Sequence, residues 1–304
     1  MKRIPIALLL LSLSATVNAQ VTRTTEVTQG ESHSFQVIQD DPKYVSDKLI
    51  GLELCGPATF SSHAALNVGI GVNGLWSLQE KLQIQGSLDW YLVQINGGMG
   101  LALEGGPALT FAEKTKMDEA KVVLKYSERS YDTPTEHVKE SSASWLEAQA
   151  TFLKRTKLRG GAYIYKTAYE NEKKFSYGKL PYTMAGVYAG IEFSKQAALI
   201  SEVDGQRGIT SGLTRIYADG LILPLRSFGG DSTGTIRQAI GGGIFGGRLG
   251  LQAYFNPNKS KHASPKMRAY QVWPTLFWKI EAGYRPAEKF FFTMGMGFLL
   301  WKNR

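Results

Sequence analysis

The sequence contains few of the residues from which metal and cofactor sites are usually built. Cys55 is the one cysteine among 304 residues, which excludes an intrachain disulfide and any cluster of cysteine ligands. Of the four histidines, none has the His-Glu-x-x-His or His-x-x-Glu-His spacing of a zinc site. We therefore expect neither a metal nor a cofactor.

The chain also lacks an apolar run of the roughly 20 residues that a helix needs to cross a bilayer. The apolar run 4–13 is shorter, follows Lys2 and Arg3, and precedes the small-residue stretch 17–19. This pattern predicts a secretory signal peptide at 1–19, rather than an anchor that stays in the membrane. We expect a mobile polar segment over 20–47 and one domain over 48–304, with no internal linker and no repeat of fixed period.

Charge of one sign is not concentrated anywhere in the chain. There are 35 Lys and Arg residues against 26 Asp and Glu residues, a formal charge of +9, but no basic block stands out. An exported protein with this distribution is not expected to bind nucleic acid. The basic excess instead favours contact with anionic lipid headgroups or sugars.

Long segments alternate between apolar and polar residues, with a period of two. Period two predicts strands, and two such runs joined by a short polar turn predict a hairpin. The clearest runs are 66–76, 82–93, 276–284 and 290–300, and further candidate strands lie near 48–60, 98–111, 119–131, 143–154, 158–170, 182–194, 212–225 and 237–255. In 158–170, Tyr163, Tyr165 and Tyr169 alternate with Lys166 and Glu170, so the tyrosines are expected on the outer face. In 290–300, phenylalanine, methionine and leucine alternate with Thr293, Gly295 and Gly297.

A soluble sandwich also alternates, but three features favour a membrane barrel. Several runs reach about a dozen residues, whereas strands of soluble proteins centre on about 5–6 and membrane strands need about 9–11. The polar faces carry Gly, Gln, Asn and charges of both signs, as in a hydrated lumen. Aromatic residues such as Trp76 and Trp90 gather toward the ends of the runs, where an interfacial girdle lies.

The predicted fold class is therefore all-β: an antiparallel transmembrane β-barrel. Counting the runs, with 196–211 taken as a loop, gives about twelve strands, and ten to fourteen stay open. Closure into a barrel removes the strand edges that lipid cannot satisfy.

On these residues the chain resembles Gram-negative outer-membrane β-barrel proteins. The resemblance rests on the signal peptide, the outward-apolar hairpin 66–93 and the terminal pair 276–301, and it is to the class rather than to one family. It implies residence in the outer membrane, contact with outer-membrane lipid and insertion by the barrel-assembly machinery. Many such barrels end in an aromatic residue, and this chain departs from them by ending in Trp301-Lys302-Asn303-Arg304.

Charged residues on the polar faces are the candidate site residues. An unpaired charge that faces hydrocarbon costs about 2–4 kcal/mol at the bilayer midplane, so an inward orientation is favoured. The predicted lumen-lining residues are Asp89, Glu147, Lys166, Glu170, Arg215, Asp219, Arg248, Lys279 and Glu281. They either pair across the lumen and brace it, or line a polar passage of weak ion selectivity.

The chain is not expected to be an enzyme. His262 and Ser264 have the two-residue spacing of outer-membrane phospholipases, but they lie in a stretch that reads as a loop, and no Asn follows at a matching place. We expect a structural barrel or one that passes small solutes to a limited extent. A barrel hydrolase acting on lipid and a secreted β-sandwich that binds a partner are the alternatives.

Overall fold

The structure is a computed structural model of the whole chain. It describes residues 21–26, 35–39, 42–46, 48–59, 65–94, 100–132, 137–169, 180–203, 206–229, 243–255, 276–286 and 289–302. Among these residues, none of the helical segments has the length and apolar character that crossing a membrane requires.

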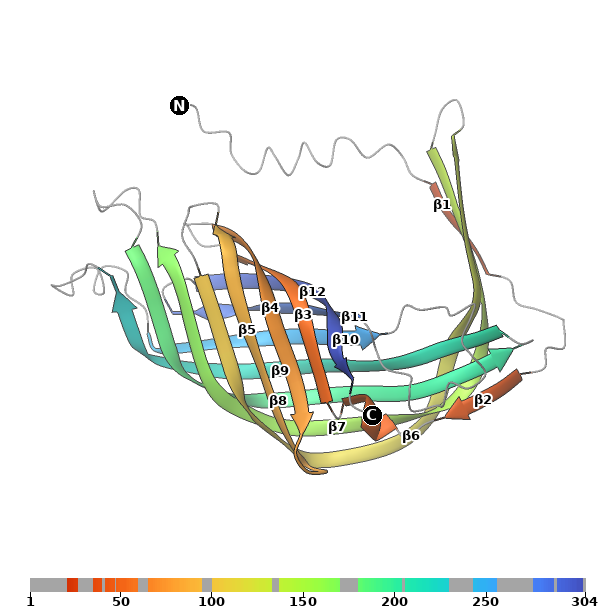
Figure 1. Cartoon of the computed structure of the whole chain (residues 1–304), viewed down its shortest axis with the longest axis horizontal. Coiled ribbons are helices and arrows are strands. Elements are labelled where there is room, and N and C mark those ends of the chain that lie inside the picture. Colours follow the sequence, from red (N-terminus) through yellow and green to blue (C-terminus); the bar gives the residue numbers. More distant parts are fainter. Residues whose placement is uncertain are drawn as a thin grey trace.

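The described chain is dominated by one closed antiparallel barrel (Figure 1). Each strand from β3 to β12 pairs with the next, and β12 pairs with β3, so ten strands form an unbroken ring. The ring strands are β3 (Lys48–Thr59), β4 (Ala65–Ser77), β5 (Leu82–Gln94), β6 (Gly100–Asp132), β7 (His137–Tyr169), β8 (Leu180–Val203), β9 (Gln206–Phe228), β10 (Phe245–Phe255), β11 (Leu276–Arg285) and β12 (Lys289–Lys302).

The barrel has ten strands rather than about twelve, because two pairs of expected strands are continuous. The expected strands 98–111 and 119–131 both belong to β6, and 143–154 and 158–170 both belong to β7. The polar residues between them do not form turns, since β6 and β7 pair along almost their whole length. The segment 196–211 is likewise strand for most of its length, as the ends of β8 and β9.

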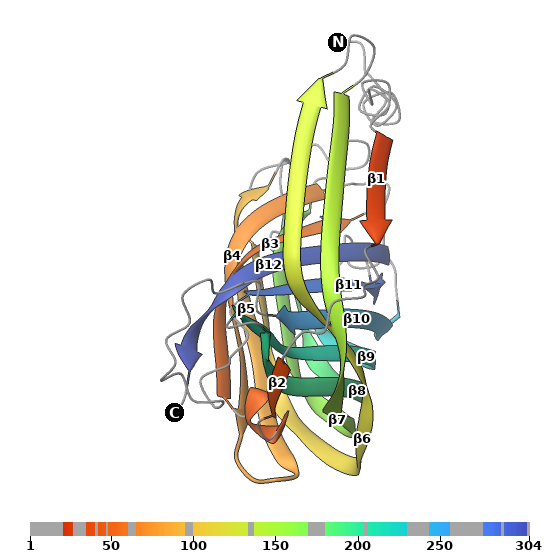
Figure 2. The ribbon, with the colours of Figure 1, turned by 90° about the vertical axis from the view of Figure 1, so that its right-hand side faces the viewer.

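Beyond the ring, β6 and β7 continue as a two-stranded arm, here residues 116–132 and 137–152, which pair with each other after the pairing of β7 with β8 has ended at Leu153. Figures 1 and 2 show this arm turning away from the barrel strands and running across one end of the ring. The first ring strand begins and the last one ends at this same end, where Leu49 is paired with Lys302. In a single-chain barrel of even strand number that end is periplasmic.

The expected mobile segment 20–47 contains three structured elements. Strand β1 (Val21–Glu26) pairs in parallel with β7, and β2 (Phe35–Gln39) pairs in antiparallel with β8. The 3-10 turn η1 (Pro42–Ser46) packs with Val45 and Ser46 buried. Pairing explains why these residues are ordered, because β1 and β2 cover edges that β7 and β8 expose where they diverge.

The two faces of the ring have opposite chemistry, as the alternation predicts. The outer surface exposes a continuous set of apolar side chains, which includes Ile70, Leu88 and Trp90 on neighbouring strands and Met296 and Phe298 on β12. The inner surface buries charged and amide side chains instead. A soluble sandwich buries apolar residues between its sheets, so this arrangement identifies a transmembrane β-barrel.

Inward-facing glycines make room for large side chains in the lumen. The ring of Tyr217 occupies the position that a Cβ atom at Gly250 would take. At Gly297 a Cβ would lie 2.7 Å from Cζ of Phe277. A side chain at either position would therefore displace an aromatic ring, and on β12 this explains why residue 297 of the inner face is a glycine.

The outward orientation predicts how charge is tolerated. Leu88, 43% exposed, lies within the apolar surface, and Leu78, 53% exposed, lies in the turn between β4 and β5. Leu88→Arg should lower the yield of inserted barrel, because a charge in hydrocarbon costs about 2–4 kcal/mol, whereas Leu78→Arg should cost about 0–1 kcal/mol. The measurement is the fraction of unboiled protein that migrates as folded barrel in a detergent gel. Equal losses for both variants would contradict the assignment of the membrane face.

Candidate functional site: the barrel lumen

The interior of the barrel is filled in three layers along its axis. At the η1 end an apolar cluster contains Val45, Leu49, Leu75, Ala198, Leu213, Tyr254 and Phe277. At the opposite end a second cluster is rich in tyrosine and contains Cys55, Tyr91, Ala102, Tyr163, Tyr165, Tyr182, Met184, Tyr188, Leu221 and Leu223. Charged and amide side chains occupy the middle. The candidate site is this middle layer, because it holds most of the buried charge of the described chain.

The η1 turn closes the periplasmic end of the lumen through backbone carbonyls. The Nε2 atoms of Gln83 and Gln196 donate hydrogen bonds to the carbonyl oxygens of Ser46 and Pro42, each at 2.8 Å. On the outside, Lys43 forms an ion pair with Glu80 at 2.6 Å, which lowers the pKa of the Glu80 carboxyl. The turn is therefore fixed to the barrel wall rather than only placed near it.

The first charged group joins three strands around Lys279. Its Nζ atom lies 2.8 Å from Oε1 of Glu53 and 3.4 Å from Oδ2 of Asp89. Asn73 adds a hydrogen bond of 3.3 Å to Glu53 and accepts one of 3.4 Å from the hydroxyl of Tyr254. One cation of β11 thus links carboxylates of β3 and β5.

The second charged group is centred on Glu192 of β8. The guanidinium of Arg215 binds both of its carboxylate oxygens, at 3.1 and 2.5 Å, and Lys157 Nζ lies 3.0 Å from one of them. Arg215 also donates to the amide oxygens of Gln252, at 2.6 Å, and Gln85. Bidentate pairing with further amide contacts holds this arginine across the lumen.

The third charged group surrounds Arg248 of β10. Its Nε atom lies 2.8 Å from Asp219, and its Nη1 atom forms ion pairs with Glu104 and, at 3.3 Å, with Glu281. Arg159 lies 3.3 Å from the other Asp219 oxygen and stacks on the ring of Tyr217, with 4.0 Å to the ring centroid. Tyr217 in turn donates to Glu281.

Arginines lie over the rings of the tyrosine-rich layer: Arg159 and Arg248 over Tyr188, and Arg285 at the end of the layer. The guanidinium of Arg285 lies 3.6 Å from the ring centroid of Phe291 and 4.3 Å from that of Tyr165. The hydroxyl of Tyr182 donates to the carbonyl of Pro286 at 3.2 Å. Cation–π stacking therefore contributes to the packing of this end.

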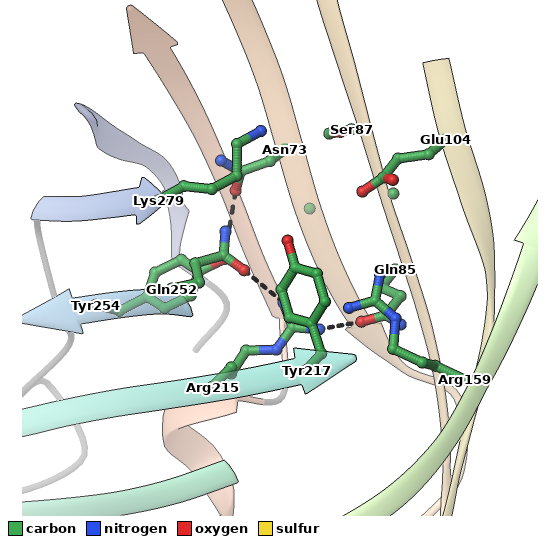
Figure 3. A pocket seen from close by; sticks show the side chains of 12 residues that line it. Asn73, Gln85, Ser87, Glu104, Arg159, Arg215, Tyr217, Gln252, Tyr254 and Lys279 are labelled. Atoms are coloured by element: carbon green, nitrogen blue, oxygen red, sulfur yellow. Dashed lines mark hydrogen bonds between the residues drawn. The ribbon is translucent and has the colours of Figure 1, made fainter. Parts of the chain in front are cut away.

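The middle layer leaves little free space. A cavity of about 20 Å³ lies among side chains of several strands, and this is room for about one water molecule. Figure 3 shows Tyr217 between Gln252 and Tyr254 on one side and Gln85 and Arg159 on the other. The geometry provides a polar cavity of about the size of a water molecule.

The structure brings together six of the nine predicted lumen residues. Asp89, Arg215, Asp219, Arg248, Lys279 and Glu281 are buried inside the barrel, in the three groups described above. Glu147 belongs to β7, but its side chain lies outside the described set, and Glu170 lies outside the described residues.

The prediction for Lys166 is wrong, because its side chain is exposed on the outer surface. Tyr163 and Tyr165, which were assigned to the lipid face, are buried in the lumen instead. Tyrosine suits either environment, so it fixes no face by itself. Residues 157–159 of β7 show which face is which, because Leu158 is exposed and its neighbours Lys157 and Arg159 are buried.

Several lumen residues escaped the sequence prediction: Glu53, Glu104, Lys157, Arg159 and Glu192. Each lies beside an apolar residue that faces outward. Glu53 stands between Leu52 and Leu54, and Glu192 precedes Phe193. Counting period two outward from these apolar neighbours would have found all five.

No group of three or more His, Cys, Asp or Glu side chains in the described part of the chain is arranged to hold a metal ion. The pair His262 and Ser264 lies outside the described residues, as do His33 and His63. The described lumen residues therefore offer hydrogen bonds and ion pairs, and Cys55 is buried among them.

No protein-family model matches the chain, and no curated protein is similar to it in sequence. Among solved structures, the chain is similar to OmpT, an outer membrane protein of Vibrio cholerae, in a loop-deletion form, at 11% identity and a TM-score of 0.19, covering 89% of this chain and 100% of that one. It is also similar to Pseudomonas aeruginosa OpdQ at 9% identity and a TM-score of 0.17, covering 84% and 100%. At these values the likenesses carry no functional argument. The closed ring with an apolar exterior and a charged interior itself makes this an outer-membrane β-barrel.

The Lys279 group predicts a large cost for removing one charge. Lys279→Met should lower the free energy of unfolding by about 3–5 kcal/mol, because Glu53 and Asp89 would stay buried without their cation. The triple variant Lys279→Met, Glu53→Gln, Asp89→Asn should recover much of the loss. Urea titration, followed by the migration of unboiled protein, measures both. A triple variant less stable than the single one would show that the carboxylates are stabilised by other groups.

Proposed function

We propose that the protein is a sealed outer-membrane barrel with a structural, non-enzymatic role in the cell envelope. The observation that supports this proposal most directly is that side chains from opposite walls meet in the middle of the lumen. Arg248 of β10 reaches Glu104 of β6, and Lys279 of β11 reaches Asp89 of β5. In a ring of ten strands these partners are four strands apart, so their contacts cross the interior.

The charge balance of the middle layer also supports bracing over transport. Six carboxylates face five cations there: Glu53, Asp89, Glu104, Glu192, Asp219 and Glu281 against Lys157, Arg159, Arg215, Arg248 and Lys279. Ion-selective pores carry rings of one sign. Here charges of opposite sign are paired within the layer with an excess of one carboxylate, so the layer has no ring of one sign to attract a solute ion.

Limited passage is the second candidate, and the water-sized polar cavity beside Tyr217 favours it. Water that enters this cavity meets Ser87, Asn73 and Gln85. Such a route would pass water or a proton rather than a solute of ordinary size. Under either candidate, the partners that we propose are outer-membrane lipid and the barrel-assembly machinery, since a closed barrel with an apolar exterior has to be inserted into lipid.

A planar-bilayer recording tests the sealed barrel. The purified, folded protein should give no stepwise conductance in 1 M KCl, because paired side chains occupy the section of the lumen through which ions would pass. Arg215→Ala, Gln252→Ala and Gln85→Ala together should produce conductance by removing one connected group. Steady conductance of the unmodified protein would rule out the sealed barrel and favour the passage.

The proposed lack of enzyme activity is tested on the candidate pair His262 and Ser264. Purified barrel should hydrolyse phospholipid no faster than the Ser264→Ala variant, measured as fatty-acid release from mixed micelles. Hydrolysis that is lost in Ser264→Ala would identify a barrel hydrolase and overturn the non-enzymatic role.

A further inference from the structure

Three lysines form a row across the outer wall at the periplasmic end of the barrel. Lys114 of β6 is directly opposite Lys154 of β7, and Lys154 is directly opposite Lys195 of β8. Residues directly opposite in neighbouring antiparallel strands have Cβ atoms about 4.5–5.5 Å apart, and like charges there are destabilising. A row of three like charges therefore needs a counter-charge.

All three side chains point outward. Ser194 and Gln196, on either side of Lys195, are buried, and so are Leu153 and Arg155 on either side of Lys154. Glu113, which precedes Lys114, faces the interior side, where it pairs with Arg155 at 2.6 Å. The lysine row thus lies on the outer face of the barrel, the same face that is apolar nearer the middle of the strands.

The row lies just below the apolar surface. Phe193 is exposed and pairs with Ile216, which is exposed as well, and Lys195 follows Phe193 by two residues, about 7 Å along the strand. Phe152 lies beneath Lys195, whose Nζ atom is 4.0 Å from the ring centroid. An aromatic residue next to lysines at the edge of an apolar band is typical of the level of lipid headgroups.

The carboxylates available on this face do not balance the lysines. Asp118 lies 3.9 Å from Lys195 and 3.8 Å from Lys116, which is the next outward lysine on β6. Among the described residues, Lys114 and Lys154 form no ion pair with a carboxylate. The patch formed by Lys114, Lys116, Lys154, Lys195 and Asp118 keeps a formal charge of +3.

We propose that this patch binds the phosphate of an anionic phospholipid in the periplasmic leaflet. The charge supplies the attraction, and the exposed Phe193 beside it contacts the acyl chains, which free phosphate does not have. This inference depends on the proposed embedding in the membrane. It does not depend on whether the lumen is sealed.

Native mass spectrometry of the detergent-solubilised barrel tests the site. Titrated phosphatidylglycerol should be retained on the folded protein, and phosphatidylcholine should not. Lys154→Gln should weaken retention about fivefold, since one lysine near an anionic surface contributes about 1 kcal/mol. The triple variant with Lys114→Gln and Lys195→Gln should abolish it.

Lys166→Gln is the matched control, because Lys166 is also outward and exposed but its opposite neighbours are Leu101 and Thr183. A gel of unboiled protein confirms that each variant is a folded barrel, so failure of embedding is seen separately. Equal retention of both lipids, equal loss in Lys166→Gln, or complete competition by inorganic phosphate at the concentration of the lipid would each overturn the proposal.

Discussion

A strand surrounded by hydrocarbon must have every backbone N–H and C=O paired within the protein, and the rest of this structure follows from that constraint. It requires the pairing of β12 with β3, because a ring is the one way to leave no edge in the membrane. Once the ring is closed, the period of two divides each strand between lipid and lumen. The interior must then be filled by what the polar face carries, and in this chain that face carries charge.

Filling a lumen with charge is tolerable only when the charges are paired. Taking an ion out of water costs several kcal/mol, and good geometry with further hydrogen bonds recovers that cost. Glu192 illustrates the requirement, since Arg215 binds both of its oxygens and Lys157 adds a third contact. Amide side chains such as Gln85 and Gln252 accept hydrogen bonds from the N–H groups of Arg215 that Glu192 does not bind.

The fold class and most of the faces could be predicted from the sequence, because apolar alternation reports directly on which side meets lipid. The orientation of β11 and β12 was predicted residue by residue. The prediction was wrong for residues 163–166 of β7, where Tyr163 and Tyr165 face the lumen and Lys166 faces outward, because tyrosine occurs on either face. The strand number and the ion-pair partner of each charged residue could not be predicted from the sequence. A polar stretch such as 112–118 is compatible with a turn or with an extramembrane strand, and the partner of Lys279 is 226 residues away in the chain.

That separation has a consequence for how the barrel is made. Glu53 is on the first ring strand and Lys279 on the last but one, so the ion pair between them, at 2.8 Å, forms when the seam closes. Before that moment an open sheet has Glu53 on the strand at one edge and Lys279 one strand in from the other edge, without each other. Contacts between distant parts of a chain form slowly, because the entropy of closing the long loop is lost before the contacts contribute any favourable free energy. Sealing of the seam and pairing of Lys279 with Glu53 are therefore one event, and a half-closed barrel gains neither.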